Sequence, residues 1–241
     1  MSKRTFTIFG HTFKPNIISD QEYDEMMRRQ QEIERAELVE RYRDNCFADK
    51  RLKESTFETD DRAHPGLSAR AQDYAKRFNE SARNGRGLLL YGTVGTGKTF
   101  MAACIANAVI EQGFSCKMTT FSRISNELQA TWEKQAYINK LMRYDLLIID
   151  DLAAERDTEY MREVVFTIID ERSRSGKPLI ITSNLTGYEL THPGDTTKSR
   201  IYSRLFEMCD LFKVEGKDRR AAKFAARRDD SPRVNYNSIA G

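Results

Sequence analysis

The sequence predicts an α/β domain in which a parallel sheet is covered by helices on both faces. Three short runs, at residues 88–91, 146–149 and 179–182, are almost entirely apolar, which is typical of strands that are buried on both faces. Segments with helical apolar spacing lie between these runs, and the alternation favours a parallel sheet. A glycine-rich loop follows the first run and precedes one of the predicted helices.

The individual elements begin after a turn-rich boundary at residues 55–67, which contains Pro65 and Gly66. Strands and helices are then expected in this order: a helix at 67–78, a strand at 88–91, a helix at 99–112 that stops before Gly113, a strand at 114–120, a helix at 123–135 that carries Trp132, a strand at 146–149, a helix with Asp157 as its N-cap that ends by Gly176, and a strand at 179–182.

The N-terminal region has a different character. Residues 20–54 are dense in charge, and their few apolar residues have helical spacing. We predict a helical N-terminal arm at residues 1–54, an α/β domain at 55–230 and a flexible tail at 231–241. Because its apolar stripe is thin, the arm would bury little surface against its own domain. It is either a solvated appendage or a docking arm for a partner protein, and the sequence does not separate these two interpretations.

Composition limits the class of protein. Of the 241 residues, 39% are hydrophobic and 31% are charged, and no apolar run reaches the length of a membrane span. The N-terminal segment lacks the apolar core of a signal peptide, and four scattered cysteines fit reduced thiols. We therefore expect a cytoplasmic protein without a membrane association. A net charge of +3 does not indicate a basic coat for nucleic acid.

The glycine-rich loop carries the first chemical signal. It matches the phosphate-binding pattern G-x-x-x-x-G-K-[ST] with Gly92, Thr93, Val94, Gly95, Thr96, Gly97, Lys98 and Thr99. Glycines let backbone N–H groups approach phosphate oxygens, and the following helix adds its positive end. Lys98 would supply charge to the β- and γ-phosphates of ATP, and the Thr99 hydroxyl would ligate Mg²⁺.

Two more strand ends carry polar groups that fit the same chemistry. Residues 146–151 read Leu-Leu-Ile-Ile-Asp-Asp, a Walker B pattern in which Asp150 would hold Mg²⁺ and Asp151 would polarise the attacking water. The next apolar strand is followed by Asn184, whose amide is placed to orient that water. The sequence therefore predicts an Mg²⁺-dependent ATPase.

With these motifs, and with the segments 51–57 and 199–206, the chain resembles AAA+ ATPases of the DnaC/DnaI helicase-loader family and the related IstB transposition ATPases. The resemblance covers about residues 50–225. It implies an arginine finger at Arg204, with Arg200 as a second candidate, that reaches the nucleotide of a neighbouring subunit. It also implies a later nucleotide-contacting arginine at Arg220, next to Arg219.

The family's substrate and partners supply the remaining expectations. The resemblance implies a spiral oligomer that holds single-stranded DNA, with DNA contacts at Trp132, Thr158 and Tyr160; the alternative for Trp132 is a place in the core. It further implies that the partner is a hexameric replicative helicase of DnaB type. Two features depart from the family: Asp151 stands where Glu is usual, which suggests slow hydrolysis, and the arm lacks the zinc site of DnaI-type loaders.

The function expected is therefore ATP-dependent loading of a replicative helicase onto single-stranded DNA, with DNA-stimulated hydrolysis. Two alternatives remain. One is an IstB-like helper ATPase for transposition, and the other is an ATP-gated, DNA-binding adaptor with little turnover. The identity of the bound partner distinguishes the first, and a steady-state ATPase measurement distinguishes the second.

Overall fold

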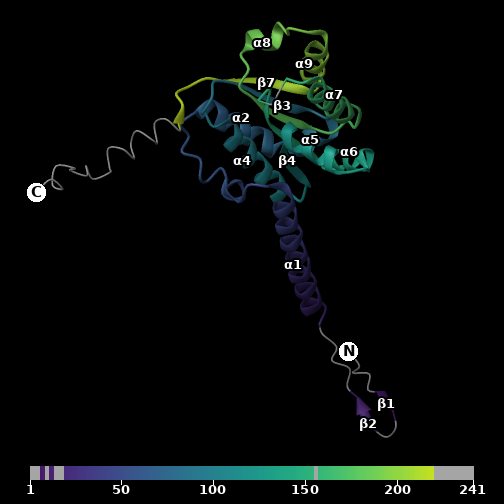
Figure 1. Cartoon of the computed structure of the whole chain (residues 1–241). Coiled ribbons are helices and arrows are strands. Elements are labelled where there is room, and N and C mark those ends of the chain that lie inside the picture. The colour runs from purple at the N-terminus through teal and green to yellow at the C-terminus, as the bar shows by residue number, and fades with distance from the viewer. Residues whose placement is uncertain (1–5, 9–10, 14–18, 155–156, 220–241) are drawn as a thin grey trace, which may run out of the picture. The chain divides into compact units, whose positions relative to one another are not determined.

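The computed structural model describes residues 6–8, 11–13, 19–154 and 157–219 of the chain (Figure 1). The chain divides into two compact units, Met1–Glu40 and Arg41–Gly241. In the first unit, the short strands β1 (Phe6–Ile8) and β2 (His11–Phe13) pair antiparallel. Helix α1 (Asp20–Cys46) begins in the first unit and ends in the second.

A capping box starts α1. The backbone N–H of Glu22 donates to Ser19 Oγ over 3.2 Å, and that of Ser19 donates to Glu22 Oε2 over 2.8 Å, so two N–H groups at the helix end are paired. The helical spacing of residues 20–54 is followed only as far as Cys46. A separate 3₁₀ helix, η1 (Lys50–Glu54), then begins because Asp49 accepts a hydrogen bond from Arg51 N.

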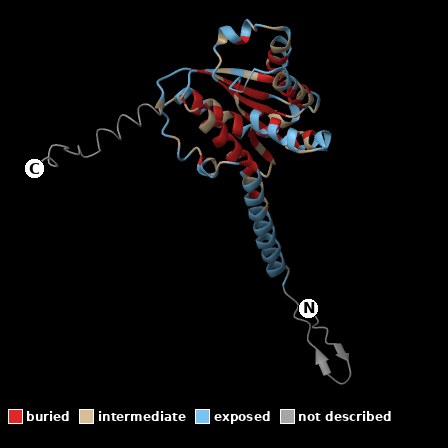
Figure 2. Cartoon of the chain, viewed as in Figure 1, coloured by how far each residue is buried: buried red, intermediate tan, exposed pale blue. Residues whose placement is uncertain are grey.

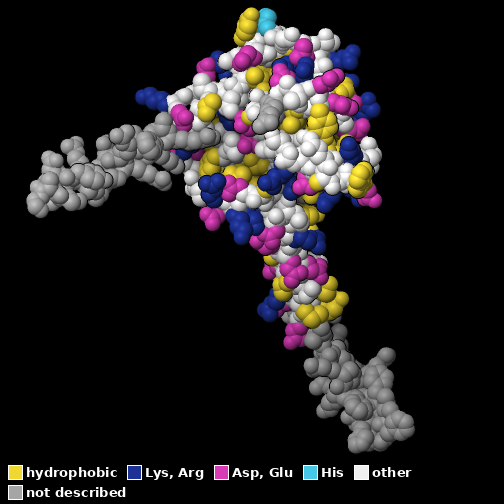
Figure 3. Space-filling view, in the orientation of Figure 1, with side chains coloured by type: hydrophobic (Ala, Val, Ile, Leu, Met, Phe, Trp, Pro, Cys, Tyr) yellow, Lys and Arg dark blue, Asp and Glu magenta, His cyan; other side chains and the backbone are white. Residues whose placement is uncertain are grey.

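Within the first unit, α1 keeps apolar side chains in solvent. Tyr23, Met26, Met27 and Ile33 are all exposed. Figure 3 shows hydrophobic side chains lying among charged ones along this helix. These four apolar side chains of the first unit are therefore left exposed to solvent.

The second unit contains one sheet of five parallel strands in the order β4-β5-β6-β3-β7. The strands are β3 (Gly87–Gly92), β4 (Cys116–Thr120), β5 (Leu146–Leu152), β6 (Leu179–Ser183) and β7 (Cys209–Val214). The predicted parallel sheet is confirmed. β7, which lies at an edge, was not expected, because its exposed and buried residues alternate and it lacks the continuous apolar run of the central strands.

Helices cover both faces of this sheet (Figure 1). One layer contains α2 and α4, and α4 packs on β4, β5 and β6; the other layer contains α5, α7 and α9. The helices are α2 (Pro65–Lys76), α3 (Phe78–Asn84), α4 (Lys98–Glu111), α5 (Phe121–Ala130), α6 (Lys134–Arg143), α7 (Glu159–Arg174), α8 (Gly187–Thr191) and α9 (Thr196–Met208). Among the described residues, none of the helices is both long and apolar enough to cross a membrane.

The central strands of the sheet lie in the buried core (Figure 2). Leu89, Leu147, Ile149 and Ile181 belong to the cluster that includes the apolar faces of α5, α7 and α9. The residues between them along each strand are also buried and point to the opposite face, toward α4. Burial on both faces explains why these strands read as continuous apolar runs.

The predicted helix at 123–135 is wrong at its C-terminal end, because the chain breaks at Thr131 and continues as α6. Thr131 has an extended conformation, and its Oγ1 accepts a hydrogen bond from Glu133 N over 3.1 Å, a local bond that competes with the helix. Trp132 therefore lies in the α5–α6 connection and not on a helix. Its exposure of 101% also excludes the core position that was the alternative for this side chain.

The predicted N-cap of α7 is also wrong by one residue. Thr158 Oγ1 accepts from Met161 N over 3.2 Å and caps the helix. The Asp157 carboxylate instead accepts a hydrogen bond from Lys198 Nζ over 2.8 Å and pairs with Arg162. A carboxylate that two cations engage is no longer aimed at the helix end, so the next hydroxyl takes the capping position.

A buried arginine of α7 contacts the end of α6 and the residues just before β5 and β6, at the edge of the sheet opposite the glycine-rich loop. Arg172, at the end of α7, is fully buried and donates to carbonyl oxygens of Met142, Tyr144, Asp145 and Pro178 over 2.6–3.4 Å. Burial lowers the pKa of Arg172 to about 10, so the guanidinium remains charged at neutral pH. It thereby fixes the end of α6 and the starts of β5 and β6 relative to α7.

Replacing Arg172 with Met is expected to reduce the free energy of unfolding by about 3 kcal/mol or more, because several buried carbonyl groups lose their donor at a cost of about 1–3 kcal/mol each. Arg143→Met, at an exposed position near the same junction, should change it by less than about 1 kcal/mol. Urea unfolding of the two variants measures the difference, and equal stabilities would show that Arg172 does not hold this junction.

Candidate functional site

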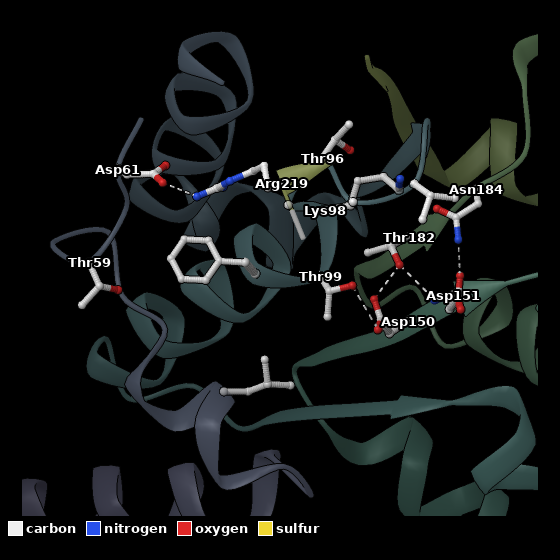
Figure 4. A pocket seen from close by; sticks show the side chains of 15 residues that line it. Thr59, Asp61, Thr96, Lys98, Thr99, Asp150, Asp151, Thr182, Asn184 and Arg219 are labelled. Carbon is white, nitrogen blue, oxygen red and sulfur yellow. Dashed lines mark hydrogen bonds and ion pairs between the residues drawn. The ribbon is translucent and has the colours of Figure 1, made fainter. Parts of the chain in front are cut away.

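The candidate site lies where the carboxyl ends of β3, β5 and β6 meet at one edge of the sheet (Figure 4). The glycine-rich loop leaves β3 and enters α4, whose first residue is Lys98. Because parallel strands end at the same edge, the polar residues after each apolar run converge there. A cavity of about 550 Å³ opens at this point, and loop residues 94–99 form much of its wall.

The loop conformation depends on its glycines. Gly92 has φ +126°, and a Cβ on it would lie 2.3 Å from Val214 O. Gly97 has φ +96° directly before the first turn of α4. Both positions exclude ordinary side chains. The carbonyl of Val214 also accepts a hydrogen bond from Thr93 N over 3.1 Å, so the end of β7 holds the loop in place.

Lys98 places a positive charge inside the loop. Its side chain is 6% exposed, and Nζ donates to the carbonyl oxygens of Gly92 (3.0 Å) and Thr93 (2.7 Å). Together with the N–H groups at the start of α4, this ammonium makes the loop a cradle for a phosphate chain. The positive charge of Lys98 and the glycine positions without room for a Cβ both fit the binding of a nucleoside triphosphate.

The acidic side of the cavity is organised by a residue that the motif analysis did not single out. Thr182 Oγ1 donates to Asp150 Oδ1 over 2.6 Å and accepts from Asp151 N over 2.9 Å. Thr99 Oγ1 donates to the other Asp150 oxygen over 3.2 Å. The threonine hydroxyl and carboxylate oxygens are hard ligands that suit Mg²⁺, which usually takes one or two protein oxygens plus phosphate oxygens. Thr99 and Asp150 are therefore the residues that would hold the ion.

Asp151 is turned out of the strand toward Asn184. Its φ is +63°, and the pairing of β5 with β6 shifts register between Ile149 and Leu152. Asn184 Nδ2 donates to Asp151 Oδ1 over 2.7 Å. A non-glycine residue held in the left-handed region costs about 1–3 kcal/mol, and such strain concentrates at functional sites. The structure thus brings together both predicted water-positioning residues beside the cavity.

Other walls of the cavity come from segments far away in the sequence. Leu52, Thr59 and Asp61 line it from the region before α2, and Arg219 lines it from the segment after β7. Arg219 N donates to Gly95 O over 3.0 Å, and its guanidinium pairs with Asp61 (Figure 4). Leu52 belongs to the segment 51–57 that carries part of the family resemblance, but no site role was predicted for it, and Thr59 and Asp61 belong to no predicted motif. Arg219 was noted only as the neighbour of Arg220, which lies outside the described residues.

The remaining predicted residues do not lie at this cavity. Arg204 and Arg200 lie on α9 and line a separate hollow. Thr158 caps α7, Tyr160 is exposed in the first turn of that helix, and Trp132 is exposed in the α5–α6 connection. The structure therefore separates one group that converges on the cavity from a second group on the outer surface.

The sheet order, the phosphate loop on β3 and the acidic residues and asparagine on the two adjacent strand ends define a P-loop ATP-binding protein of the AAA+ class. A family model described as IstB-like ATP-binding protein matches residues 19–226, and the chain belongs to this family.

Curated relatives include both kinds of protein that the motifs resembled. The replicative helicase loader DnaI of Bacillus subtilis is 30% identical over 182 residues, which are 69% of this chain and 58% of that protein. An ATP-binding protein of a Mycobacterium tuberculosis insertion sequence is 32% identical over 67% of this chain and 62% of that protein. The loader DnaC of Escherichia coli is 27% identical over 51% of each chain. The chain thus spans between about half and three fifths of the length of these relatives.

Solved structures establish the same fold. A DnaC helicase loader aligns with a TM-score of 0.60 at 20% identity, covering 69% of this chain and 100% of that one. DnaI aligns with a TM-score of 0.61 at 23% identity, covering 74% and 99%. The expected resemblance to the DnaC/DnaI and IstB proteins is therefore confirmed.

Thr182→Val is expected to lower Mg²⁺-dependent ATP turnover or Mg²⁺ affinity about 10–100-fold, because removing an outer partner of a metal-holding carboxylate has effects of this size. Val has the same shape but leaves Asp150 and the Asp151 N–H without the hydroxyl. Nucleotide binding measured without Mg²⁺ should be unchanged, in contrast to Lys98→Ala, which should abolish most of it. Thr182→Ser keeps the hydroxyl and serves as the control; a Val variant as active as the Ser variant would contradict the assignment.

Proposed function

We propose that this chain is an ATP-dependent loader that places a hexameric replicative helicase on single-stranded DNA and releases it upon ATP hydrolysis. The observation that carries the proposal is the division between a cavity that gathers the phosphate loop, Asp150, Asp151 and Asn184, and an outer face that carries Arg204. The DnaI and DnaC relatives named as helicase loaders support the choice of partner.

Within the cavity, each group of this chain has a defined task. Lys98 and the loop N–H groups bind the phosphates, and Thr99 and Asp150 hold Mg²⁺. When bound, Mg²⁺ supplies charge neutralisation at the phosphate oxygens. Asp151 accepts a proton from the attacking water or orients it, and Asn184 fixes the direction of the Asp151 carboxylate.

Arg204 completes the site of a neighbouring subunit in this proposal. Its side chain is 44% exposed and lies on α9, outside the cavity of its own chain. A cation at that position stabilises transition-state charge only in a second copy. The subunits would then associate into an ATP-dependent spiral, and hydrolysis would require the assembled state.

The N-terminal arm and the exposed outer residues would make the remaining contacts. The exposed apolar side chains of α1, Tyr23, Met26, Met27 and Ile33, form a face for a helicase subunit. Trp132 can stack on a base, and the hydroxyls of Thr158 and Tyr160 can bond phosphates, which suits DNA binding without sequence preference. We propose these as the DNA contacts.

A second candidate function is an IstB-like helper ATPase for transposition, which the family description and the insertion-sequence relative favour. An ATP-gated adaptor with little turnover is a third, because Asp151 is shorter than the usual Glu and its conformation is held by Asn184. Both share the nucleotide site and differ from the loader in partner and in turnover.

The isolated monomer is expected to bind ATP but hydrolyse it slowly, with specific activity that rises with protein concentration and with single-stranded DNA. Arg204→Ala should keep the nucleotide affinity and lose the stimulated rate, since an arginine finger is worth about 10³-fold or more. Arg200→Ala, on the same helix, is the matched control. If Arg200→Ala loses the stimulation while Arg204→Ala keeps it, the finger is Arg200.

The partner assignment is tested at α1. A deletion of residues 1–54 would also remove buried Cys46 and cavity-lining Leu52. Substitutions on α1 therefore test the partner contact without disturbing the core or the cavity. Met26→Gln with Ile33→Gln should weaken capture of DnaB-type helicases at least about tenfold, because each buried apolar side chain contributes about 1.5–3 kcal/mol. Glu25→Gln with Glu32→Gln is the control. Capture of a transposase in place of any helicase would favour the helper function.

A further inference from the structure

A second hollow, of about 510 Å³, lies between α7 and α9. Three arginines line it, Arg174 from α7 and Arg200 and Arg204 from α9, and the only acidic side chain among the described lining residues is Asp170. The excess of positive charge suits an anion such as the phosphate chain of a nucleotide held by a second copy of this chain. This step rests on the proposed function of Arg204.

Asp170 differs from the surface carboxylates of the chain. Its side chain is only 11% exposed, and one oxygen, Oδ1, lies 3.4 Å from Arg204 Nε. The other oxygen, Oδ2, lies 2.8 Å from a terminal nitrogen of Arg174. Because α7 packs directly on α9, the position of this carboxylate is set by the core and not by a flexible surface chain.

The guanidinium of Arg204 contacts two carboxylates of its own chain. Asp170 engages Nε, and Glu207 Oε2 accepts a hydrogen bond from Nη1 over 3.1 Å. Nη2 has no partner among the described residues. An arginine whose Nε pairs with a nearly buried carboxylate has fewer accessible orientations, and such preorganisation lowers the entropy lost when Nη2 meets a phosphate.

The two carboxylates that contact Arg204 are not equivalent. Glu207 is 58% exposed and sits three residues along the same helix, and such surface pairs contribute about 0–1 kcal/mol. Asp170 is nearly buried and belongs to a different helix. Through this contact, the packing of α7 against α9 constrains the position of the Arg204 guanidinium.

We infer that Asp170 is a positioning residue for the trans-acting arginine: it sets the orientation of Arg204 on the face that each subunit offers to its neighbour. Asp170 does not touch the nucleotide of either subunit. Its loss should therefore impair the subunit as a donor of the finger, while the same subunit remains competent to bind ATP and to be activated by a neighbour.

Asp170→Asn is expected to lower kcat of the DNA-stimulated ATPase about tenfold, with less than a twofold change in KM and an unchanged affinity for ATP. Asp170→Glu keeps the charge but moves the carboxylate by one methylene, so it should give an intermediate loss. Glu207→Gln makes the same change of charge at the exposed contact and should stay within twofold of the unmodified protein.

Subunit mixing separates this role from a general loss of structure. Asp170→Asn mixed with Asp151→Asn should recover activity, because the intact finger of the second variant reaches the intact cavity of the first. Asp170→Asn mixed with Arg204→Ala should not recover, because both subunits then offer a defective face. If Asp170→Asn does not fold, the two mixtures are made with Asp170→Glu.

The outcomes are distinct. Recovery in neither mixture, or in both, overturns the positioning role, and so does a rate that rises in Asp170→Asn. A normal stimulated rate in Arg204→Ala defeats the proposed finger itself, whereas a dead Arg204→Ala with a normal Asp170→Asn defeats only the present inference.

Discussion

The insertion of β6 between β3 and β5 is the constraint on which the arrangement of the ATP site depends. Ser183 lies opposite Tyr91 on one side and Leu152 on the other, and its hydroxyl donates to Leu152 O over 2.9 Å in the buried interior. One residue earlier, Thr182 reaches both acidic residues of β5. A shift of β6 by one residue would turn Thr182 to the other face of the sheet, so the register of one strand determines whether Thr182 contacts the two acidic residues.

The site is also closed by segments that the sheet does not supply. The chain before α2 and the chain after β7 meet over the loop through the Asp61–Arg219 pair and the Arg219–Gly95 hydrogen bond. Inside the loop, two backbone carbonyls accept hydrogen bonds from Lys98 Nζ.

The outer surface carries different functional groups from the cavity. The cavity gathers the groups that we propose act on a nucleotide bound by the same chain, whereas the α7–α9 hollow presents arginines away from it. In the proposed function, this division makes each chain contribute half of two composite sites. Activity would then depend on assembly of the subunits, which fits the proposed loading of a helicase on DNA.

The sequence by itself determined the parallel α/β fold and the residues of the phosphate loop, Asp150, Asp151 and Asn184. Each of these follows from a local pattern, an apolar run and the polar residues after it, and parallel strands necessarily bring such ends together. The tertiary structure decided the parts that depend on contacts between distant segments: Thr182 as the partner of both aspartates, Asp61 beside Arg219, and Asp170 behind Arg204. It also decided that Trp132 lies in a break between helices and that Thr158 caps α7, because local hydrogen bonds and ion pairs outweighed the helical periodicity. Nothing in a single stretch of sequence encodes these pairings, since they exist only after packing has fixed which strand and which helix become neighbours.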